Sequence, residues 1–355
     1  MPIVPLYGHE PLRARLSQAV QHATLPGSLL LHGTRGVGKQ RLALWLAQLL
    51  LCERDDRPCG ACPGCRHTLE LRHPDLYWFY PRARLKDPDP DPSDVLEDFA
   101  ESTMDRVARH GLYAPPLGTE GLYVATIRTL VQRAGLAPAM GRRKVFIVGD
   151  AERMVSQEGA DQAANAFLKL LEEPLPDTTL ILTSSEPGAL LPTIRSRVVA
   201  FRCAPLSETD VREFLSNPLV TETLRELDVP PQTESRVALA AGAPGVLFAG
   251  ATLNSAMLAA REMVAAAERR DSATMYSTAL AQGASSARGA FSDTLDALQR
   301  VLRDRTRDAI ARGDLHAASS ASRAIDAVMQ AQARADGNVN PQLITAQLLR
   351  ALALP

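Results

Sequence analysis

The chain of 355 residues is long enough for two or three domains, each able to bury a core. Its hydrophobic fraction of 46%, charged fraction of 22% and formal net charge of −1 are those of an ordinary globular protein and give no global nucleic-acid signature. No apolar run approaches the ~20 residues of a membrane span, and the N-terminus has no signal-peptide pattern. We therefore expect a cytoplasmic protein.

Strand and helix patterns alternate along the first part of the chain, which indicates βαβ units and a parallel sheet covered by helices on both faces. This domain is expected to close near residue 204. The predicted strands are 28–32, the aromatic run 73–79, 145–148, 180–183 and 198–201. The predicted helices are 7–24, 40–51, 123–138 and 157–172.

One segment breaks this alternation. Prolines and aspartates alternate in Lys86–Pro92, and this pattern disfavours both a helix and a central strand. We expect residues 81–95 to form an exposed loop and residues 95–110 to form a short helix. The simplest interpretation of the whole insertion is a solvated surface excursion.

The remainder of the chain is predicted to be helical. Ser207 and Asp210 resemble a capping box at the start of a helix through Leu215, within a small helical unit that ends near residue 250. From there to the C-terminus the pattern indicates an α-helical bundle. One apolar face carries Phe291, Leu295, Leu298 and Leu302, and another carries Ile325, Val328 and Met329.

The first candidate site follows the strand 28–32. Gly33, Gly36 and Gly38 allow the backbone N–H groups to turn inward at the N-terminus of a helix, and Lys39 can reach outer phosphates. Lysine occurs only four times in the sequence, so a chance lysine here is improbable. The last position of this phosphate loop, where Ser or Thr holds Mg²⁺, is Gln40.

A second strand end should supply an adjacent pair of acidic residues to such a loop. Here Asp150 is a single carboxylate, because Gly149 leaves the neighbouring place empty. Glu152 lies two residues further on and is expected to point elsewhere. Asp150 is at least as well explained as a cap of a turn or helix.

The second candidate site is a cluster of four cysteines, Cys52, Cys59, Cys62 and Cys65. This spacing is typical of thiolates that bind tetrahedral Zn²⁺ in a closed structural site. An iron–sulfur cluster and disulfides are the alternatives, of which disulfides are disfavoured in a reducing cytosol. Cys203 stands apart and is expected to be a small buried hydrophobic residue.

Taken together with further motifs, these features resemble the bacterial clamp-loader subunits of the AAA+ class over nearly the whole chain. The further motifs are His73–Asp75, Asn165–Pro174, Thr193–Val198, Ala241–Gly245 and Asn338–Leu349. The resemblance implies an α/β AAA+ P-loop domain over 1–204, a small helical lid domain over 205–250 and a helical collar or oligomerisation domain over 251–355. It places a four-cysteine zinc module at 52–65 and an acidic, proline-rich insertion at 81–120 inside the first domain.

The resemblance also implies roles for single residues. Arg197 would be an arginine finger that reaches the γ-phosphate of ATP held by a neighbouring motor subunit, although an ordinary surface arginine is the alternative. Ser184 would be the first sensor of that phosphate. The second sensor is normally an arginine, and its place here is Gly245. Gln40, Gly149 and Gly245 thus depart from the active pattern and argue against useful ATP hydrolysis.

The implied function is that of a non-motor (stator) subunit of the DNA polymerase III clamp loader. Its partners would be gamma/tau and delta subunits in a hetero-pentamer, and the sliding clamp and primer-template DNA through that complex, with no membrane. One alternative is an active gamma/tau-like ATPase. Another is a zinc-dependent nucleic-acid-binding module, which the near-neutral charge disfavours. Whether the loop binds ATP stays open.

Overall fold

The computed structural model describes residues 3–114, 120–154, 161–283, 290–336 and 339–353. The chain divides into two compact units. Of the described residues, the first unit comprises those up to Phe248 apart from 227–229, and the second comprises 227–229 and those from Ala249 onward. The small helical part expected at 205–250 falls almost wholly within the first unit in this division.

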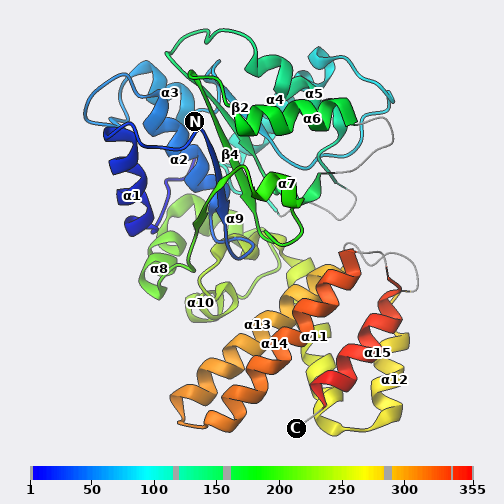
Figure 1. The fold of residues 1–355 in the computed structure, drawn as a ribbon. Coiled ribbons are helices and arrows are strands. Elements are labelled where there is room, and N and C mark those ends of the chain that lie inside the picture. The colour runs from blue at the N-terminus through cyan, green and yellow to red at the C-terminus, as the bar shows by residue number, and fades with distance from the viewer. Residues whose placement is uncertain (1–2, 115–119, 155–160, 284–289, 337–338, 354–355) are drawn as a thin grey trace. The chain divides into compact units, whose positions relative to one another are not determined.

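A five-stranded parallel sheet forms the centre of the first unit (Figure 1). The strands are β1 (Ser28–His32), β2 (Leu76–Phe79), β3 (Lys144–Val148), β4 (Thr178–Ser184) and β5 (Val199–Arg202). Their order across the sheet is β2-β3-β4-β1-β5. The central strands β3 and β4 are buried along their whole length, as a parallel sheet covered on both faces requires. The predicted parallel α/β sheet is therefore confirmed.

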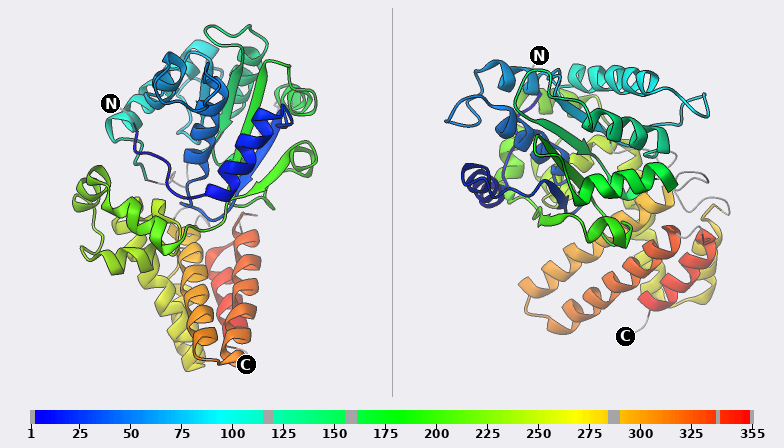
Figure 2. Two further views of the ribbon diagram at one scale, coloured as in Figure 1. Left: turned by 90° about the vertical axis from the view of Figure 1, so that its left-hand side faces the viewer. Right: turned by 45° about the horizontal axis from the view of Figure 1, so that its top comes forward.

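Helices cover both faces of this sheet. They are α1 (Glu10–Gln21), α2 (Lys39–Leu51), α3 (Pro63–Leu69), α4 (Pro92–Ala108), α5 (Val124–Ala134), α6 (Asp161–Glu172) and α7 (Pro192–Arg195), with the 3-10 turn η1 (Ala151–Arg153). Figure 1 shows α1, α2 and α3 on one side of the sheet and α5 and α6 on the other, and the right-hand view of Figure 2 separates α1 from α6 in the same way. The helices α2 and α3 lie opposite α5 and α6 because crossovers are right-handed, and the chain moves toward one edge of the sheet from β1 to β2 and toward the other edge after β2.

The start of α4 differs from the sequence prediction. The prediction of a loop over 81–95 is wrong at its C-terminal end, because α4 already begins at Pro92. Proline is tolerated at the first position of a helix, where its missing N–H has no intrahelical partner to lose. Asp91 and Asp94 form a capping box that completes this start. Of the helix expected at 157–172, residues 157–160 lie outside the described residues.

The insertion 81–120 is not simply a solvated excursion. Val95 and Phe99 on α4 are buried, with 3% and 6% of their surface exposed. The Phe99 ring packs edge-to-face on the Phe79 ring at the end of β2, with centroids 5.0 Å apart. The described part of the insertion therefore adds to the core of the first unit, while residues 115–119 lie outside the described residues.

Short helical elements complete the first unit. They are α8 (Glu208–Ser216), α9 (Pro218–Arg225), α10 (Thr233–Ala240) and the 3-10 turn η2 (Pro244–Ala249). The capping box predicted for α8 is confirmed, because Asp210 N–H donates to Ser207 Oγ at 3.1 Å and Ser207 N–H donates to Asp210 Oδ2 at 3.2 Å.

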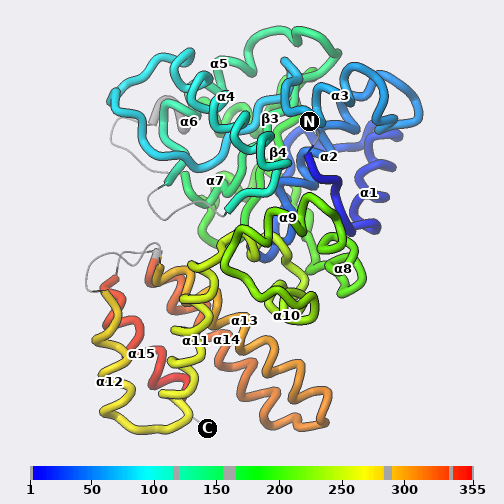
Figure 3. The backbone as a smooth tube through the Cα atoms, turned by 180° about the vertical axis from the view of Figure 1, so that it is seen from behind, coloured from blue at the N-terminus to red at the C-terminus, as the bar shows by residue number. Residues whose placement is uncertain are grey.

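The regular secondary structure in the described residues of the second unit is all helical, as the sequence predicts. Its helices are α11 (Ala251–Arg269), α12 (Ser272–Leu280), α13 (Ala290–Ala311), α14 (Leu315–Asp336) and α15 (Pro341–Leu352). α13 packs against both α11 and α14, and Figure 3 shows these helices from behind. The apolar face predicted on α13 is buried, since Phe291, Leu295, Leu298 and Leu302 are at most 6% exposed. No helix in the described ranges is long and apolar enough to cross a membrane.

The face predicted on α14 is only partly correct. Val328 is fully buried and Ile325 is half-buried, but Met329 is 55% exposed. Adjacent residues on a helix point about 100° apart, so residues 328 and 329 cannot both face the core.

Candidate functional site

The phosphate loop Gly33–Gln40 lies where three adjacent parallel strands end. β1 leads into the loop, β3 ends just before Gly149 and Asp150, and β4 ends at Ser184. The loop, Asp150 and Ser185 line one cavity of about 150 Å³ within the first unit. The carboxyl ends of parallel strands are the usual place for a ligand in such a sheet.

The loop backbone has the conformation that its glycines allow. Gly36 has φ +80° and Gly38, the N-cap of α2, has φ +100°, both in the left-handed region. Gly36 O accepts a hydrogen bond of 2.9 Å from Gly245 N–H. A β-carbon at Gly245 would lie 2.8 Å from Gly36 O, so the backbone contact leaves no room for a side chain there.

Lys39 is buried beneath the loop. Its Nζ donates to Gly33 O at 3.0 Å, to Thr34 O at 3.1 Å and to Ser185 Oγ at 2.8 Å. Burial lowers the pKa of Lys39, while the nearby carboxylates of Asp150 and Glu152 act in the opposite direction. Lys39 thus ties the loop to the end of β4.

Gln40 does not point into solvent. Its Nε2 donates to Asp150 Oδ2 at 3.0 Å, and its Oε1 accepts hydrogen bonds from Trp78 and Tyr113. The Asp150 carboxylate is therefore hydrogen-bonded to the side chain that replaces the expected Ser or Thr. Asp150 N–H in turn donates to Thr183 Oγ1 at 3.0 Å, which fixes the turn after β3.

Two residues near the loop were missed by sequence reasoning. Glu152 is not among the residues that line the cavity, but it lies against the residue after β4: its Oε1 accepts from Ser185 N–H at 2.9 Å, and its Oε2 is buried without a hydrogen-bond partner. Burial and the Asp150 carboxylate raise the pKa of Glu152. Ser184, predicted as the first sensor, is fully buried and its Oγ accepts from Glu186 N–H, whereas Ser185 faces the cavity and contacts Lys39.

Part of the cavity lining is apolar and aromatic. It is lined by Tyr7, Leu206, Phe214 and Phe248, and the rings of Tyr7 and Phe214 meet edge-to-face with centroids 5.6 Å apart. Ligand pockets commonly have volumes of roughly 300–1,000 Å³. The cavity, at about 150 Å³, therefore matches part of a nucleotide rather than a whole one in this conformation.

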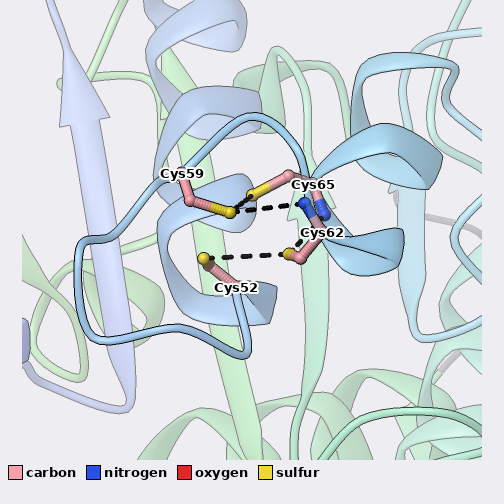
Figure 4. A group of neighbouring side chains, drawn as sticks. All are labelled: Cys52, Cys59, Cys62 and Cys65. Atoms are coloured by element: carbon pink, nitrogen blue, oxygen red, sulfur yellow. Dashed lines mark hydrogen bonds between the residues drawn. The ribbon is translucent and has the colours of Figure 1, made fainter.

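The four predicted cysteine ligands converge (Figure 4). Cys52 follows α2, Cys62 caps α3, Cys65 lies within α3, and the loop between the helices carries Cys59. The sulfur atoms all lie within 4.8 Å of one another, with Cys52 and Cys62 at 3.9 Å and Cys59 and Cys65 at 4.0 Å. Tetrahedral Zn–S bonds of about 2.3 Å separate sulfurs by about 3.8 Å. The cluster could therefore hold a metal ion.

The backbone around the cluster favours the thiolate form of Cys59, whereas burial raises the pKa of Cys65. Cys62 N–H points at Cys59 Sγ over 3.3 Å, and Cys65 N–H points at Cys62 Sγ over 3.4 Å. Backbone N–H groups of Ala61 and Cys62 lower the pKa of Cys59 to about 6. No disulfide joins any of the five cysteines, and burial raises the pKa of Cys203 to about 11, as for an inert buried thiol.

Arg197 lies just before β5 and is 28% exposed at its side chain. Its Nε donates to Glu172 Oε2 at 3.1 Å, and its Nη1 donates to Thr193 O at 2.9 Å. These partners belong to α6 and α7, so the guanidinium is held near the surface by residues of these two helices and not by the phosphate loop.

Comparisons with known proteins agree with the motifs. The family model described as DNA polymerase III, delta subunit matches residues 8–207, which is more than half of the chain. The DNA polymerase III subunit delta' of Pseudomonas aeruginosa is 32% identical over 235 residues, 66% of this chain and 57% of the relative. The delta' subunit of Escherichia coli K12 is 28% identical over 62% of this chain and 53% of the relative.

Proteins described as tau or gamma subunits are also similar. The DNA polymerase III subunit tau of Salmonella typhimurium is 29% identical over 65% of this chain and 30% of its own length. Among solved structures, a gamma subunit-related protein of Thermotoga maritima is 18% identical over 95% of this chain and 98% of its own, with a TM-score of 0.39. The matches thus span about half the length of the delta' relatives and less of tau. With the family model matched over residues 8–207, the chain belongs to the DNA polymerase III, delta subunit family.

Proposed function

We propose that this chain is a non-motor (stator) subunit of a bacterial DNA polymerase III clamp loader, and that its first unit has the AAA+ fold. In this role it helps to load the sliding clamp onto primed DNA during replication. The family match and the delta' relatives support the assignment to this complex. The similarity of delta' and tau relatives leaves the choice between stator and motor to the site itself.

The observation that carries the non-motor assignment is the backbone contact between Gly36 and Gly245. In a motor subunit an arginine near this place would contact the phosphates. Here Gly245 N–H is bonded to Gly36 O, and a β-carbon at residue 245 would lie within 2.8 Å of that oxygen. The loop therefore packs directly on the polypeptide where the sensor side chain would be needed.

Arg197 is proposed to act on a neighbour's ATP. A guanidinium at a γ-phosphate neutralises charge in the transition state, and such fingers are worth about 10³–10⁵ in rate. Its position near the surface supports this role. To reach across a subunit boundary Arg197 must leave Glu172, and a partly exposed ion pair of this kind contributes only about 0.2–1 kcal/mol.

The remaining parts receive supporting roles. The helices of the second unit form the collar through which this chain joins gamma/tau and delta subunits in a hetero-pentamer. Cys52, Cys59, Cys62 and Cys65 hold a structural Zn²⁺, which clamps the loop between α2 and α3. Sliding clamp and primer-template DNA are contacted through the complex.

An active gamma/tau-like ATPase is the second candidate. It is favoured by the retained Lys39 and by Glu152, which lies close enough to Lys39 to affect its pKa. Purified with Mg²⁺, such a motor would hydrolyse ATP by itself and would lose this activity in the Lys39→Ala variant.

The test is reconstitution with the gamma/tau and delta subunits of the same organism. We expect the isolated chain to hydrolyse no ATP, and we expect a stable complex whose DNA-stimulated ATP hydrolysis requires this chain. Size-exclusion chromatography and steady-state phosphate release measure the two results. Lys39-dependent ATP hydrolysis by the isolated chain would instead establish the motor.

A further inference from the structure

The Gln40 amide is fixed by three hydrogen bonds from three different parts of the first unit. Its Oε1 accepts from Trp78 Nε1 at 3.1 Å and from Tyr113 Oη at 3.2 Å, and its Nε2 donates to Asp150 Oδ2 at 3.0 Å. An indole N–H can only donate and a carboxylate can only accept. The two ends of the amide therefore cannot exchange places without losing these bonds.

The amide also fills the space beside Gly149. A β-carbon at residue 149 would lie 2.7 Å from Gln40 Oε1 and 2.8 Å from its Cδ and Nε2. Real β-carbons do not approach other atoms this closely, so a side chain at residue 149 and the observed Gln40 conformation exclude each other. Gln40 in the loop and Gly149 after β3 both depart from the motor pattern. These two departures therefore belong to one packing arrangement.

The partners of Gln40 are supported from the insertion. Tyr113 follows α4, and the Arg106 guanidinium on α4 lies over the rings of Tyr113 at 3.8 Å and Trp78 at 4.5 Å. Burial raises the pKa of Tyr113 to about 12, so its hydroxyl remains a hydrogen-bond donor throughout the physiological range. Trp78 is only 7% exposed.

The residues present do not fit a magnesium ion. Mg²⁺ prefers near-octahedral oxygen ligands and is usually held by one or two carboxylates. At this loop the only side-chain oxygen of residue 40 accepts from Trp78 and Tyr113, its N–H group occupies Asp150 Oδ2, and residue 149 has no side chain. The Gln40 side-chain oxygen and one of the two Asp150 carboxylate oxygens are therefore already engaged in hydrogen bonds within the protein.

We propose that β2 and the insertion together exclude Mg²⁺ from the phosphate loop: Trp78 on β2 and Tyr113 in the insertion, supported by Arg106, hold the Gln40 amide on Asp150 and against Gly149, in the place of a metal and its second carboxylate. This inference deepens the non-motor function on which it rests. It gives the residues after β2 a role in the site, and it predicts that Mg²⁺ does not strengthen the binding of any polyphosphate to this loop.

Calorimetric titration of ATP into the full chain, with Mg²⁺ or with EDTA, tests this directly. In the natural chain Mg²⁺ is expected to leave the affinity for ATP unchanged or weaker, or no binding is seen in either condition. The variant Gln40→Ser/Gly149→Asp supplies both missing oxygen ligands and removes the amide. In that variant Mg²⁺ should strengthen ATP binding by about tenfold or more. Adding Lys39→Ala should abolish this gain.

A second measurement needs no ligand. Gly149→Ala should lower the melting temperature of the natural chain by several degrees, because the methyl group collides with the Gln40 amide. In a Gln40→Ala background the same substitution should have little effect. In a Trp45→Phe background Trp78 is the sole tryptophan, and its fluorescence should shift when Gln40→Ala removes its hydrogen-bond partner.

The inference is overturned if Mg²⁺ strengthens ATP binding to the natural chain, or if the folded double variant gains no dependence on Mg²⁺. Additive effects of Gly149→Ala and Gln40→Ala on the melting temperature would also overturn the inference. This measurement decides even if the Gln40→Ser/Gly149→Asp variant fails to fold. The result that refutes this inference differs from the result that refutes the proposed function. Magnesium-assisted binding without hydrolysis refutes only the metal exclusion, whereas ATP hydrolysis by the isolated chain refutes the stator.

Discussion

Asp75 accepts a hydrogen bond of 2.7 Å from the N–H of Gly141, 66 residues further along the chain. The same carboxylate accepts from Met140 N–H at 2.8 Å and from Ala139 N–H at 2.5 Å. Asp75 is only 1% exposed. Burial by itself would raise the pKa of Asp75, but the three backbone donors outweigh it and lower the pKa. The motif His73–Asp75 therefore fixes the loop that enters β3.

Asp75→Ala is expected to destabilise the first unit by on the order of 3 kcal/mol, because three buried backbone N–H groups lose a charged acceptor. Urea unfolding followed by circular dichroism measures the change. Asp87→Ala, at an exposed aspartate in the acidic loop, is the matched control and should change stability by less than about 0.5 kcal/mol. Equal effects of the two substitutions would show that the Asp75 bonds are unimportant.

Asp75 also predicts a dependence on acid. Because its pKa is lowered in the folded state, its contribution is fully present above the unfolded value of about 3.8 and is lost as the pH falls through the folded value. Asp75→Asn should therefore lose less stability than the natural chain below pH 4. Parallel loss of stability in both proteins would contradict this role.

Glu152 predicts the opposite trend. Its pKa is raised by burial and by Asp150, so its carboxyl favours folding while it is protonated, and this contribution is lost as the pH rises from its unfolded value of about 4.5 through the raised folded value. Glu152→Gln, which stays neutral, should melt at a higher temperature than the natural chain near pH 8 and at about the same temperature near pH 4. Calorimetric melting across this range checks the prediction. A stability difference that does not change with pH would refute it.

The cysteine cluster predicts one bound zinc ion for each chain. Cys62→Ser should lose the metal and lower the melting temperature of the first unit by about 5 °C or more, because a structural metal contributes directly to folding. Cys203→Ala is the matched control, since Cys203 is buried outside the cluster and should leave the metal content unchanged. Elemental analysis of protein purified without chelators that finds no stoichiometric metal would contradict the site.

The parts of the site that could be predicted are those set by short stretches of sequence. The β1 strand, the glycine turn and the start of α2 follow from local patterns, as does the cysteine spacing in 52–65. The partners of Gln40 could not be predicted, because Trp78 and Tyr113 lie 38 and 73 residues away and meet it only through the order of the strands. No pattern in the sequence points to these contacts.

The predicted ends of β4 and α4 differ from the observed ends for another reason, which is local rather than long-range. The structure extends β4 through Ser184, whose side chain is buried, so the serine that reaches Lys39 is the next one, Ser185. One residue along a strand reverses the direction of the side chain. Similarly, proline at the start of α4 acts as a helix initiator, although the same residue type forbids a helix interior.

The most direct test of the stator account is DNA-stimulated ATP hydrolysis by the reconstituted loader carrying Arg197→Ala, compared with Arg195→Ala, an exposed arginine two residues earlier. Both loaders should assemble, as judged by size-exclusion chromatography. The account predicts that Arg197→Ala sharply lowers hydrolysis, because it removes a finger worth about 10³–10⁵ at one neighbouring site, and that Arg195→Ala does not. Unchanged hydrolysis in an assembled loader with Arg197→Ala would contradict the account.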